Sequence, residues 1–365
     1  PRHRIRDGKA NWDRRRHTIA SHTRLSRMPA SFACATVGFT GIRPGRAVPR
    51  RDRIDRPRAA RVASASGAAV HPGPTTLPNS FQGEAVAMRE ARDASGPRRS
   101  FSLHRVSEHD ALVTQGKDVR ILHFVRHAQG THNVDQQYRE ARHHDARLTG
   151  FGEQQCEILA RTPAAIEAQT SASLVVTSPL TRCVQTALLS FPDIAKRSDV
   201  PCVALECIRE TCNFACDGRR ERSSIAKDFP GVDFTTDTSV GDTDELWARY
   251  EALCGPVSEY DGHRESCDLP SVADRARAFF AWLQRRPERE AIVSSHSAFL
   301  RCLFSYGQDG GVASAPDQGL GIAVWGSDGN DVDAPVVDYG VDVVLEERLR
   351  RDWENCEMRT FLVAY

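Results

Sequence analysis

Two arginines and two histidines have side chains that could do chemistry, and each lies shortly after a short apolar run. They are Arg126, His127, Arg182 and His296. Guanidinium and imidazole groups that converge on one point bind anions, and phosphate suits their geometry. A neutral imidazole held through one ring nitrogen can attack a phosphoryl group with the other and form a phosphohistidine. These residue types therefore predict a phosphate pocket with a nucleophilic histidine.

Such a reaction also needs a proton donor for the alkoxide that leaves. The usual donor is a carboxyl group whose pKa is raised by burial. Glu206, Glu210 and Asp217 all follow the apolar run 200–205 and are candidates. The spacing alone leaves the choice among them open.

Strands and helices alternate from Asp118 onward and could position these groups. Apolar, β-rich runs occupy 119–125, 174–176, 200–205 and 291–293, and apolar residues recur with helical spacing over 180–191, 272–283 and 299–304. This alternation predicts an α/β protein, a three-layer α/β/α sandwich with a mainly parallel central sheet. Sites in such sheets lie beyond the carboxyl ends of the strands, which is where the arginines and histidines fall.

The motifs at these positions resemble those of the histidine phosphatase superfamily, also called phosphoglycerate mutase-like. RHAQGTHN at 126–133 is similar to the Arg-His-Gly signature, in the RHAQGxHN form of a plant, algal and fungal subgroup. Further matches are DARLT at 145–149, SPLTRCVQTA at 178–187, RETCNFACDGRR at 209–220 and SSHSAFLR at 294–301. The resemblance runs from about Ile121 to the last predicted strand, which is about two thirds of the chain.

The resemblance implies a role for each matching residue. His127 would be the phosphorylated nucleophile and Glu210 the proton donor. The phosphate-binding set would comprise Arg126, Arg182 and His296. Three further residues are expected to bind substrate, namely Asn133 through its side chain, Ser297 through its backbone N–H, and Gln129, which replaces a commoner Glu.

The function expected from this resemblance is metal-independent hydrolysis of a small phosphorylated metabolite, with no cofactor. A phosphoglycerate-mutase-type phosphotransferase is the alternative, although the mutase motifs around the proton donor are missing. A catalytically silent phosphate-binding module is a second alternative. We expect substrate specificity to reside in the insertions 135–147 and 213–268; the sequence does not indicate an oligomeric state.

The charge of the chain is unevenly distributed. The 365 residues carry a formal charge of +1, but residues 1–70 hold 17 Lys and Arg against 4 Asp and Glu, so this part carries +13 and the remainder −12. We predict a disordered Arg-rich leader over 1–70, with a possible plastid transit peptide from about Met28; a cytoplasmic protein is the alternative. Residues 71–117 are expected to be a linker or lead-in, and 118–365 the phosphatase domain. Arg126, Arg182 and His296 would focus positive charge within this acidic body.

Composition also argues against several classes of protein. A net charge of +1 disfavours a nucleic-acid binder, and no apolar run of about 18 residues is present to cross a membrane. The 11 cysteines are expected to be mostly reduced, and the intervals among Cys202, Cys207, Cys212 and Cys216 match no common zinc spacing. Residues 328–333 are expected to be an acidic loop rather than a calcium site. Asp242, Asp244 and Glu245 are expected to begin a helix or, alternatively, to face the substrate.

Overall fold

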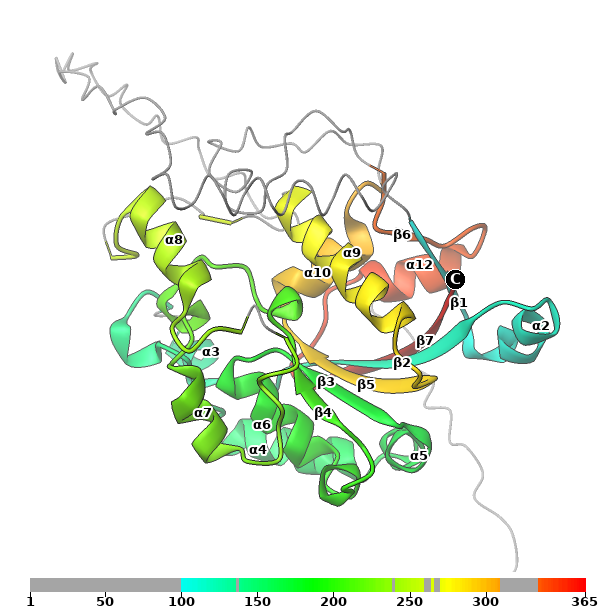
Figure 1. The fold of residues 1–365 in the computed structure, drawn as a ribbon, viewed down its shortest axis with the longest axis horizontal. Helices are drawn as coiled ribbons and strands as arrows, with labels where there is room; N and C mark the ends of the chain where they lie inside the picture. The colour runs from blue at the N-terminus through cyan, green and yellow to red at the C-terminus, as the bar shows by residue number, and fades with distance from the viewer. Residues whose placement is uncertain (1–99, 136–137, 238–239, 259–263, 266–269, 309–333) are drawn as a thin grey trace, which may run out of the picture. The chain divides into compact units, whose positions relative to one another are not determined.

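The computed structural model describes residues 100–365 except 136–137, 238–239, 259–263, 266–269 and 309–333 (Figure 1). The predicted leader over 1–70, most of the predicted linker and the acidic segment 328–333 lie outside the described residues.

The described part of the chain is built on a seven-stranded sheet with the order β4-β3-β5-β2-β7-β1-β6. The strands are β1 (Phe101–His104), β2 (Val119–Arg126), β3 (Leu174–Thr177), β4 (Cys202–Ala204), β5 (Glu290–Ser295), β6 (Val337–Asp338) and β7 (Met358–Ala364). Strands β4, β3, β5 and β2 pair in parallel, as do β1 and β6, whereas β7 runs antiparallel to its neighbours β2 and β1. The predicted, mainly parallel sheet is therefore confirmed.

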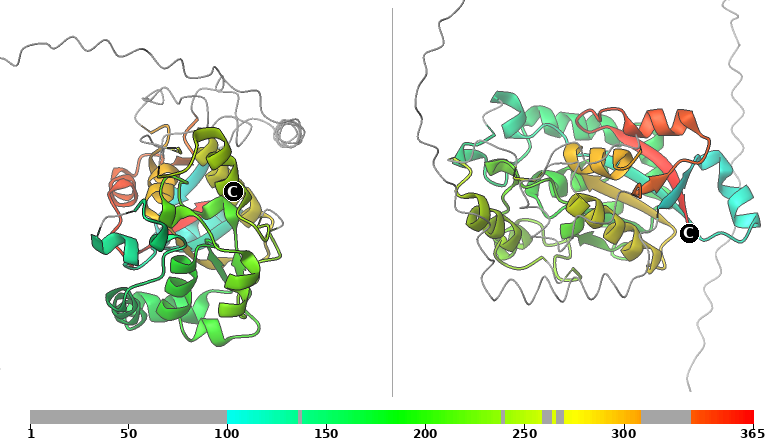
Figure 2. Two further views of the ribbon diagram at one scale, coloured as in Figure 1. Left: turned by 90° about the vertical axis from the view of Figure 1, so that its left-hand side faces the viewer. Right: turned by 90° about the horizontal axis from the view of Figure 1, so that it is seen from above.

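Helices cover both faces of this sheet, which confirms the predicted three layers (Figures 1 and 2). One face carries α9 (Pro270–Gln284), α10 (Ser297–Ser305) and α12 (Val343–Arg350), and the other carries α4 (Gly150–Ala160), α5 (Pro163–Ser171) and α6 (Thr181–Ser190). The central strands are buried on both sides: Phe124 and Val176 point into the α9–α10 core, while Val125 and Val175 point into the α4–α6 core. This alternation explains why these strands consist of continuous apolar runs.

Nine further elements lie in the described residues. They are α2 (His109–Thr114), α3 (Thr131–Asp135), α7 (Arg222–Asp228), α8 (Glu245–Cys254) and the 3₁₀ turns η1 (Val106–Glu108), η2 (Ala141–His143), η3 (Ile194–Lys196), η4 (Glu206–Ile208) and η5 (Ala215–Asp217). The expected helix start at Asp244 is confirmed: it is the N-cap of α8, and its carboxylate accepts a hydrogen bond from the Trp247 N–H at 3.0 Å.

The folded body begins earlier than the predicted boundary at Asp118. Strand β1 and helix α2 lie within the segment expected to be a linker or lead-in. The Phe101 ring packs 4.8 Å from the Phe280 ring of α9, measured between centroids, and β1 pairs with β7. Because β1 has the sequence FSLH and no continuous apolar run, its place in the sheet depends on distant partners rather than on a recognisable local pattern.

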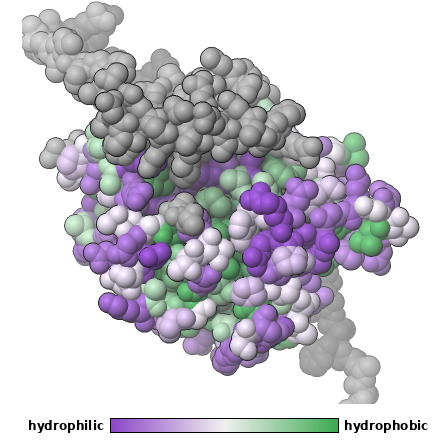
Figure 3. All heavy atoms as spheres, in the orientation of Figure 1, coloured by the Kyte–Doolittle hydropathy of each residue, from purple (hydrophilic) through white to green (hydrophobic). Residues whose placement is uncertain are grey.

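No helix among the described residues is long and apolar enough to span a membrane. On the face shown in Figure 3, hydrophilic and hydrophobic residues are interspersed. Several exposed apolar side chains, such as Phe151 and Ile158, belong to α4. Scattered exposed apolar residues of this kind are ordinary on protein surfaces.

Candidate active site

His127 follows directly after β2, and hydrogen bonds to three other segments hold the backbone of His127 and Ala128. Its N–H donates to the Ser295 carbonyl of β5 at 2.9 Å, and its carbonyl accepts from Asn355 Nδ2 at 3.0 Å and from the Cys356 N–H at 3.3 Å. The next N–H, that of Ala128, donates to Thr186 Oγ1 at 3.0 Å. The position of His127 is therefore fixed by β5, α6 and the segment that leads into β7.

The imidazole of His127 is held in one tautomer. Nδ1 lies 2.8 Å from the Ala128 carbonyl oxygen, which can only accept, so Nδ1 carries the proton. Burial, together with the nearby Arg182 and Arg126, lowers the pKa of His127 well below its ordinary value. The ring is therefore neutral at neutral pH, and Nε2 carries the free lone pair that a nucleophile requires.

Arg182 is placed by the start of α6 and by a buried carboxylate. Asp145 accepts hydrogen bonds from the N–H of Thr181 at 2.8 Å and from its hydroxyl at 2.5 Å, which fixes the first turn of the helix. The Arg182 guanidinium then donates to the Cys216 carbonyl at 2.5 Å and to Asp217 Oδ1 at 3.2 Å. The side chain is 1% exposed and its Nε has no hydrogen-bond partner in the described part of the chain. A phosphate oxygen could accept a hydrogen bond from such an N–H.

Arg126 and His296 flank His127 in different ways. Arg126 lines the cavity beside His127, and its Nε is likewise buried without a partner among the described residues. His296 precedes α10, and its ring centroid lies 5.2 Å from that of His127. Its Nε2 is 2.7 Å from Ser178 Oγ.

The surroundings of His296 disfavour the positive charge that the sequence suggests for it. Burial, followed by the proximity of Arg182, lowers its pKa well below the ordinary value, so the ring is neutral at neutral pH. The positive charge beside His127 comes from the two arginines, and His296 can contribute only a ring N–H or a lone pair.

The three candidate proton donors have different surroundings. Glu206 is paired with Arg209 and is not among the residues that line the cavity. Asp217 lines it, and burial raises the pKa of Asp217 to about 6, but its oxygens are bonded to Arg182 and to the N–H groups of Asn213 and Phe214.

Glu210 also lines the cavity and is bonded differently. Its oxygens accept from the backbone N–H groups of Thr211 at 3.0 Å, Phe299 at 3.0 Å and Ala298 at 3.3 Å. These bonds anchor Glu210 at the start of α10, without an ion pair to a phosphate-binding arginine.

A cavity of about 510 Å³ brings most of the predicted site residues together. It is lined by Arg126, His127, Asn133, Arg182, Glu210 and Ser297, whereas His296 is not among the lining residues, although its ring centroid is 5.2 Å from that of His127. Asn133 Oδ1 accepts from the Gly130 N–H at 2.9 Å. Ser297 begins α10, so its N–H belongs to a helical turn whose N–H groups have no intrahelical acceptor.

Gln129 is not among the residues that line the cavity, which contradicts the expectation that it binds substrate. Its Oε1 accepts from the hydroxyl of Thr149 at 2.9 Å. Thr149 is the N-cap of α4, so Gln129 helps to attach that helix to the nucleophile loop. Sequence proximity to His127 did not reveal that the side chain turns away.

Several lining residues were not predicted individually, among them His132, Tyr138, Phe214, Glu265 and Arg301. For His132, the sequence contains one indication, the glycine of RHAQGTHN. A Cβ at Gly130 would lie 2.6 Å from Cε1 of His132. His132 is 5% exposed, and burial lowers its pKa to about 2. Gly130 therefore permits a neutral, buried imidazole beside His127.

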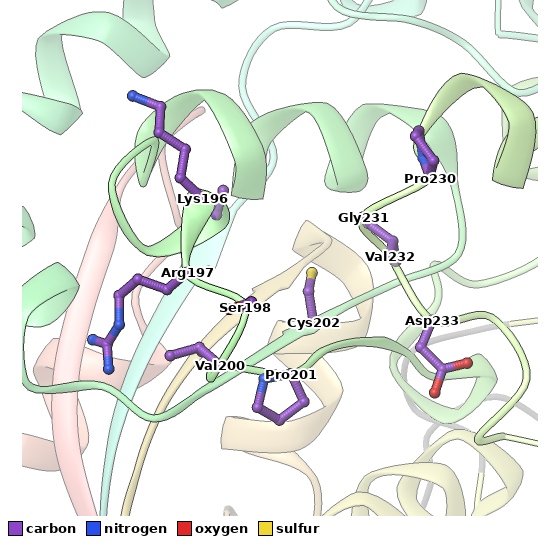
Figure 4. Close-up of a pocket in the computed structure, with 11 residues that line it drawn as sticks. Lys196, Arg197, Ser198, Val200, Pro201, Cys202, Pro230, Gly231, Val232 and Asp233 are labelled. Atoms are coloured by element: carbon purple, nitrogen blue, oxygen red, sulfur yellow. The ribbon is translucent and has the colours of Figure 1, made fainter. Parts of the chain in front are cut away.

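A second cavity of about 400 Å³ lies beside edge strand β4 and contains no comparable group of reactive side chains (Figure 4). Arg197 and Asp233 lie on opposite sides of Cys202 in this view. Arg197 pairs with Asp199 at 2.7 Å, and Asp233 accepts hydrogen bonds from Thr235 and Thr236. The chemistry is therefore concentrated around His127. Across the described residues, no three or more His, Cys, Asp or Glu side chains are arranged to hold a metal ion.

The fold and the site together define an α/β protein with a buried histidine beside two arginines in one cavity. A family model described as histidine phosphatase superfamily, branch 1, matches residues 122–320. The chain therefore belongs to the histidine phosphatase superfamily. It is an enzyme of the phosphatase or mutase type.

Similar proteins include two from Arabidopsis thaliana and one solved structure. A phosphoglycerate mutase-like protein of Arabidopsis thaliana is 32% identical over 221 residues, which cover 52% of this chain and 76% of that protein. Phosphoglycerate mutase-like protein 2 of the same plant is 30% identical over 301 residues, covering 67% and 74%. A solved mycobacterial glucosyl-3-phosphoglycerate phosphatase is 23% identical, with a TM-score of 0.30 and coverage of 50% of this chain and 79% of that one.

Proposed function

We propose that the protein hydrolyses the phosphomonoester of a small metabolite through a phosphohistidine at His127. The observation that carries this proposal is the hydrogen bond from Nδ1 of His127 to the Ala128 carbonyl, because it leaves Nε2 unprotonated beside Arg126 and Arg182. Electrostatic stabilisation by the two guanidinium groups suits the charge on the phosphoryl oxygens in the transition state.

The reaction has two steps. Nε2 of His127 attacks phosphorus, the bond from phosphorus to the ester oxygen breaks, and the departing oxygen takes a proton from the Glu210 carboxyl. Water then attacks the phosphohistidine and returns a proton to Glu210, while the bonding pair of the P–N bond returns to Nε2. We assign the proton to Glu210 rather than Asp217 because Asp217 is bonded to Arg182.

Trapping the intermediate tests this mechanism directly. Brief incubation with a radiolabelled phosphomonoester should label the wild-type protein at an acid-labile, base-stable site, and His127→Ala should abolish both labelling and turnover. Turnover by His127→Ala equal to that of the wild type would refute the proposal. Phosphate binding without a phosphoenzyme would instead identify a silent binding module.

Two further variants test the assignment of Glu210. Glu210→Gln should slow an alkyl phosphate at least about a hundredfold but p-nitrophenyl phosphate much less, because nitrophenolate leaves without a proton. Asp217→Asn should slow both esters similarly, since it disturbs Arg182. The reverse pattern would assign the proton to Asp217.

A mutase remains the second candidate because the Arabidopsis relatives are described as phosphoglycerate mutase-like. Product analysis with 3-phosphoglycerate distinguishes the two reactions. Inorganic phosphate supports the hydrolase, and 2-phosphoglycerate supports the mutase.

A further inference from the structure

The cavity wall contains a row of rings that leads away from the nucleophile. The ring centroid of His132 lies 5.6 Å from that of His127, Tyr138 follows at 6.0 Å, and Phe214 follows at 5.4 Å from Tyr138. All four side chains line the cavity. Separations of roughly 4.5–7 Å are those at which aromatic rings attract one another. The four rings therefore form a continuous aromatic surface that begins at His127.

The outer two rings differ from the inner two in exposure. His127 and His132 are buried, whereas Tyr138 and Phe214 are half-buried and keep part of their surface open. They come from the two insertions expected to hold specificity, before η2 and before η5. The Arg139 guanidinium lies 5.8 Å from the Phe214 ring centroid, a cation–π contact that supports the ring.

The size of the cavity indicates a substrate larger than a phosphate group. A volume of about 510 Å³ falls among those of pockets that enclose whole organic ligands, roughly 300–1,000 Å³. The phosphoryl group would occupy the end at His127, Arg126 and Arg182. The remaining space beside Tyr138 and Phe214 would be filled by the alcohol part of the ester.

The charge of the wall distinguishes between two kinds of alcohol. The described residues that line the cavity include three guanidinium groups, of Arg126, Arg182 and Arg301, and three carboxyl groups, of Glu210, Asp217 and Glu265. His127 and His132 add no charge, because burial lowers their pKa. With Glu210 protonated, as the proposed mechanism requires, the wall carries one more guanidinium group than carboxylates. The negative charge of the phosphoryl group offsets this excess, which disfavours a second anionic group on the substrate.

We propose that Tyr138 and Phe214 form the leaving-group subsite, and that the preferred substrates are phosphomonoesters whose alcohol carries a flat aromatic ring. The inference rests on the proposed phosphatase function and deepens it. The phosphoryl group is held at His127 while the aromatic ring of the alcohol packs against the two outer rings.

The test compares 2-phenylethyl phosphate with ethyl phosphate. Their alcohols have similar acidity, so the difference in kcat/KM reports binding of the ring rather than leaving-group chemistry. We expect a ratio of at least about 10 in favour of the phenylethyl ester, equivalent to about 1.4 kcal/mol. Tyr138→Ala and Phe214→Ala should each lower that ratio severalfold. Phe151→Ala is the matched control, because Phe151 is 56% exposed on α4 and is not a lining residue; it should keep both the ratio and the activity.

Three outcomes would overturn the inference. The first is a wild-type ratio near 1, and the second is a ratio that neither cavity variant changes although both still form the phosphoenzyme. The third is a tenfold preference for 3-phosphoglycerate over the phenylethyl ester that is lost in Arg301→Gln, which would assign an anionic alcohol. Failure of the proposed function is distinguishable, because then neither ester would be hydrolysed and His127 would not be labelled.

Discussion

Replacing Asp145 should both destabilise the protein and weaken its phosphate site. The side chain is fully buried and accepts from the Thr181 N–H at 2.8 Å, the Thr181 hydroxyl at 2.5 Å and Arg220 Nε at 2.8 Å. Its backbone has a φ of +48°, which asparagine tolerates better than alanine does. These contacts define the first turn of α6, from which Arg182 reaches the cavity.

The expected magnitude follows from the groups that would lose partners. Asp145→Ala leaves the buried Thr181 N–H unsatisfied, at about 1–3 kcal/mol, and removes the charge-assisted bonds to the Thr181 hydroxyl and to the partly exposed Arg220, so the total should be about 3–5 kcal/mol. Asp145→Asn keeps one acceptor and the backbone conformation, and should cost about 2 kcal/mol. With a urea m-value of up to about 3 kcal/mol per M, the alanine variant should lower the unfolding midpoint by about 1 M or more.

Urea unfolding and steady-state kinetics measure the two effects separately. Asp145→Asn should lower kcat/KM for a phosphomonoester about tenfold in protein that is still folded, because the Arg182 backbone shifts. Asp228→Asn is the control, since Asp228 is an exposed partner of the same Arg220 at 3.1 Å, and its loss should leave the midpoint unchanged. A midpoint shift below about 0.3 M for Asp145→Ala, with kcat/KM unchanged, would refute this account of α6.

Three other predictions concern the nucleophile loop. Gly130→Ala should lower kcat/KM at least about tenfold without loss of secondary structure by circular dichroism, because the new Cβ displaces the His132 ring. The free energy of unfolding should decline as the pH falls below 6.5, because His132 binds a proton in the unfolded chain but stays neutral in the folded protein, where its pKa is about 2. Urea midpoints measured at several pH values should fall less steeply for His132→Phe than for the wild type, and an equal dependence on pH would contradict this. Asn355→Ala removes the donor at 3.0 Å from the His127 carbonyl, so it should lower kcat severalfold and the free energy of unfolding by about 1 kcal/mol. An unchanged kcat would show that β5 and Cys356 suffice to hold His127 in place.

The strands that carry the site were predictable because they are buried on both faces. β2, β3, β4 and β5 each contain a short apolar run, and the residues that follow them in sequence meet at one end of the sheet. Strand β1 has the sequence FSLH, without a continuous apolar run, and β6 has only two residues, so their pairing cannot be inferred from local pattern. The position of β7 between β2 and β1 likewise depends on long-range pairing, which local propensity does not specify.

Most of the predicted site residues lie together, but the charge expected at one of them is not favoured by its surroundings. Arg126, His127, Arg182 and Glu210 line one cavity because they follow buried elements. The neutrality of His296 could not be predicted, since it results from tertiary burial. Tyr138 and Phe214 were missed individually because each lies in an irregular segment, where hydrophobic periodicity is absent.

The late position of β7 in the chain determines when the active site can exist during synthesis. Residues 355–364 supply the Asn355 and Cys356 contacts to His127 and fill the gap between β2 and β1. A nascent chain that lacks them would expose one edge of β2 and present an incompletely supported nucleophile. Unpaired edges of this kind invite association with other chains. The support of His127 is therefore complete only after these residues have left the ribosome.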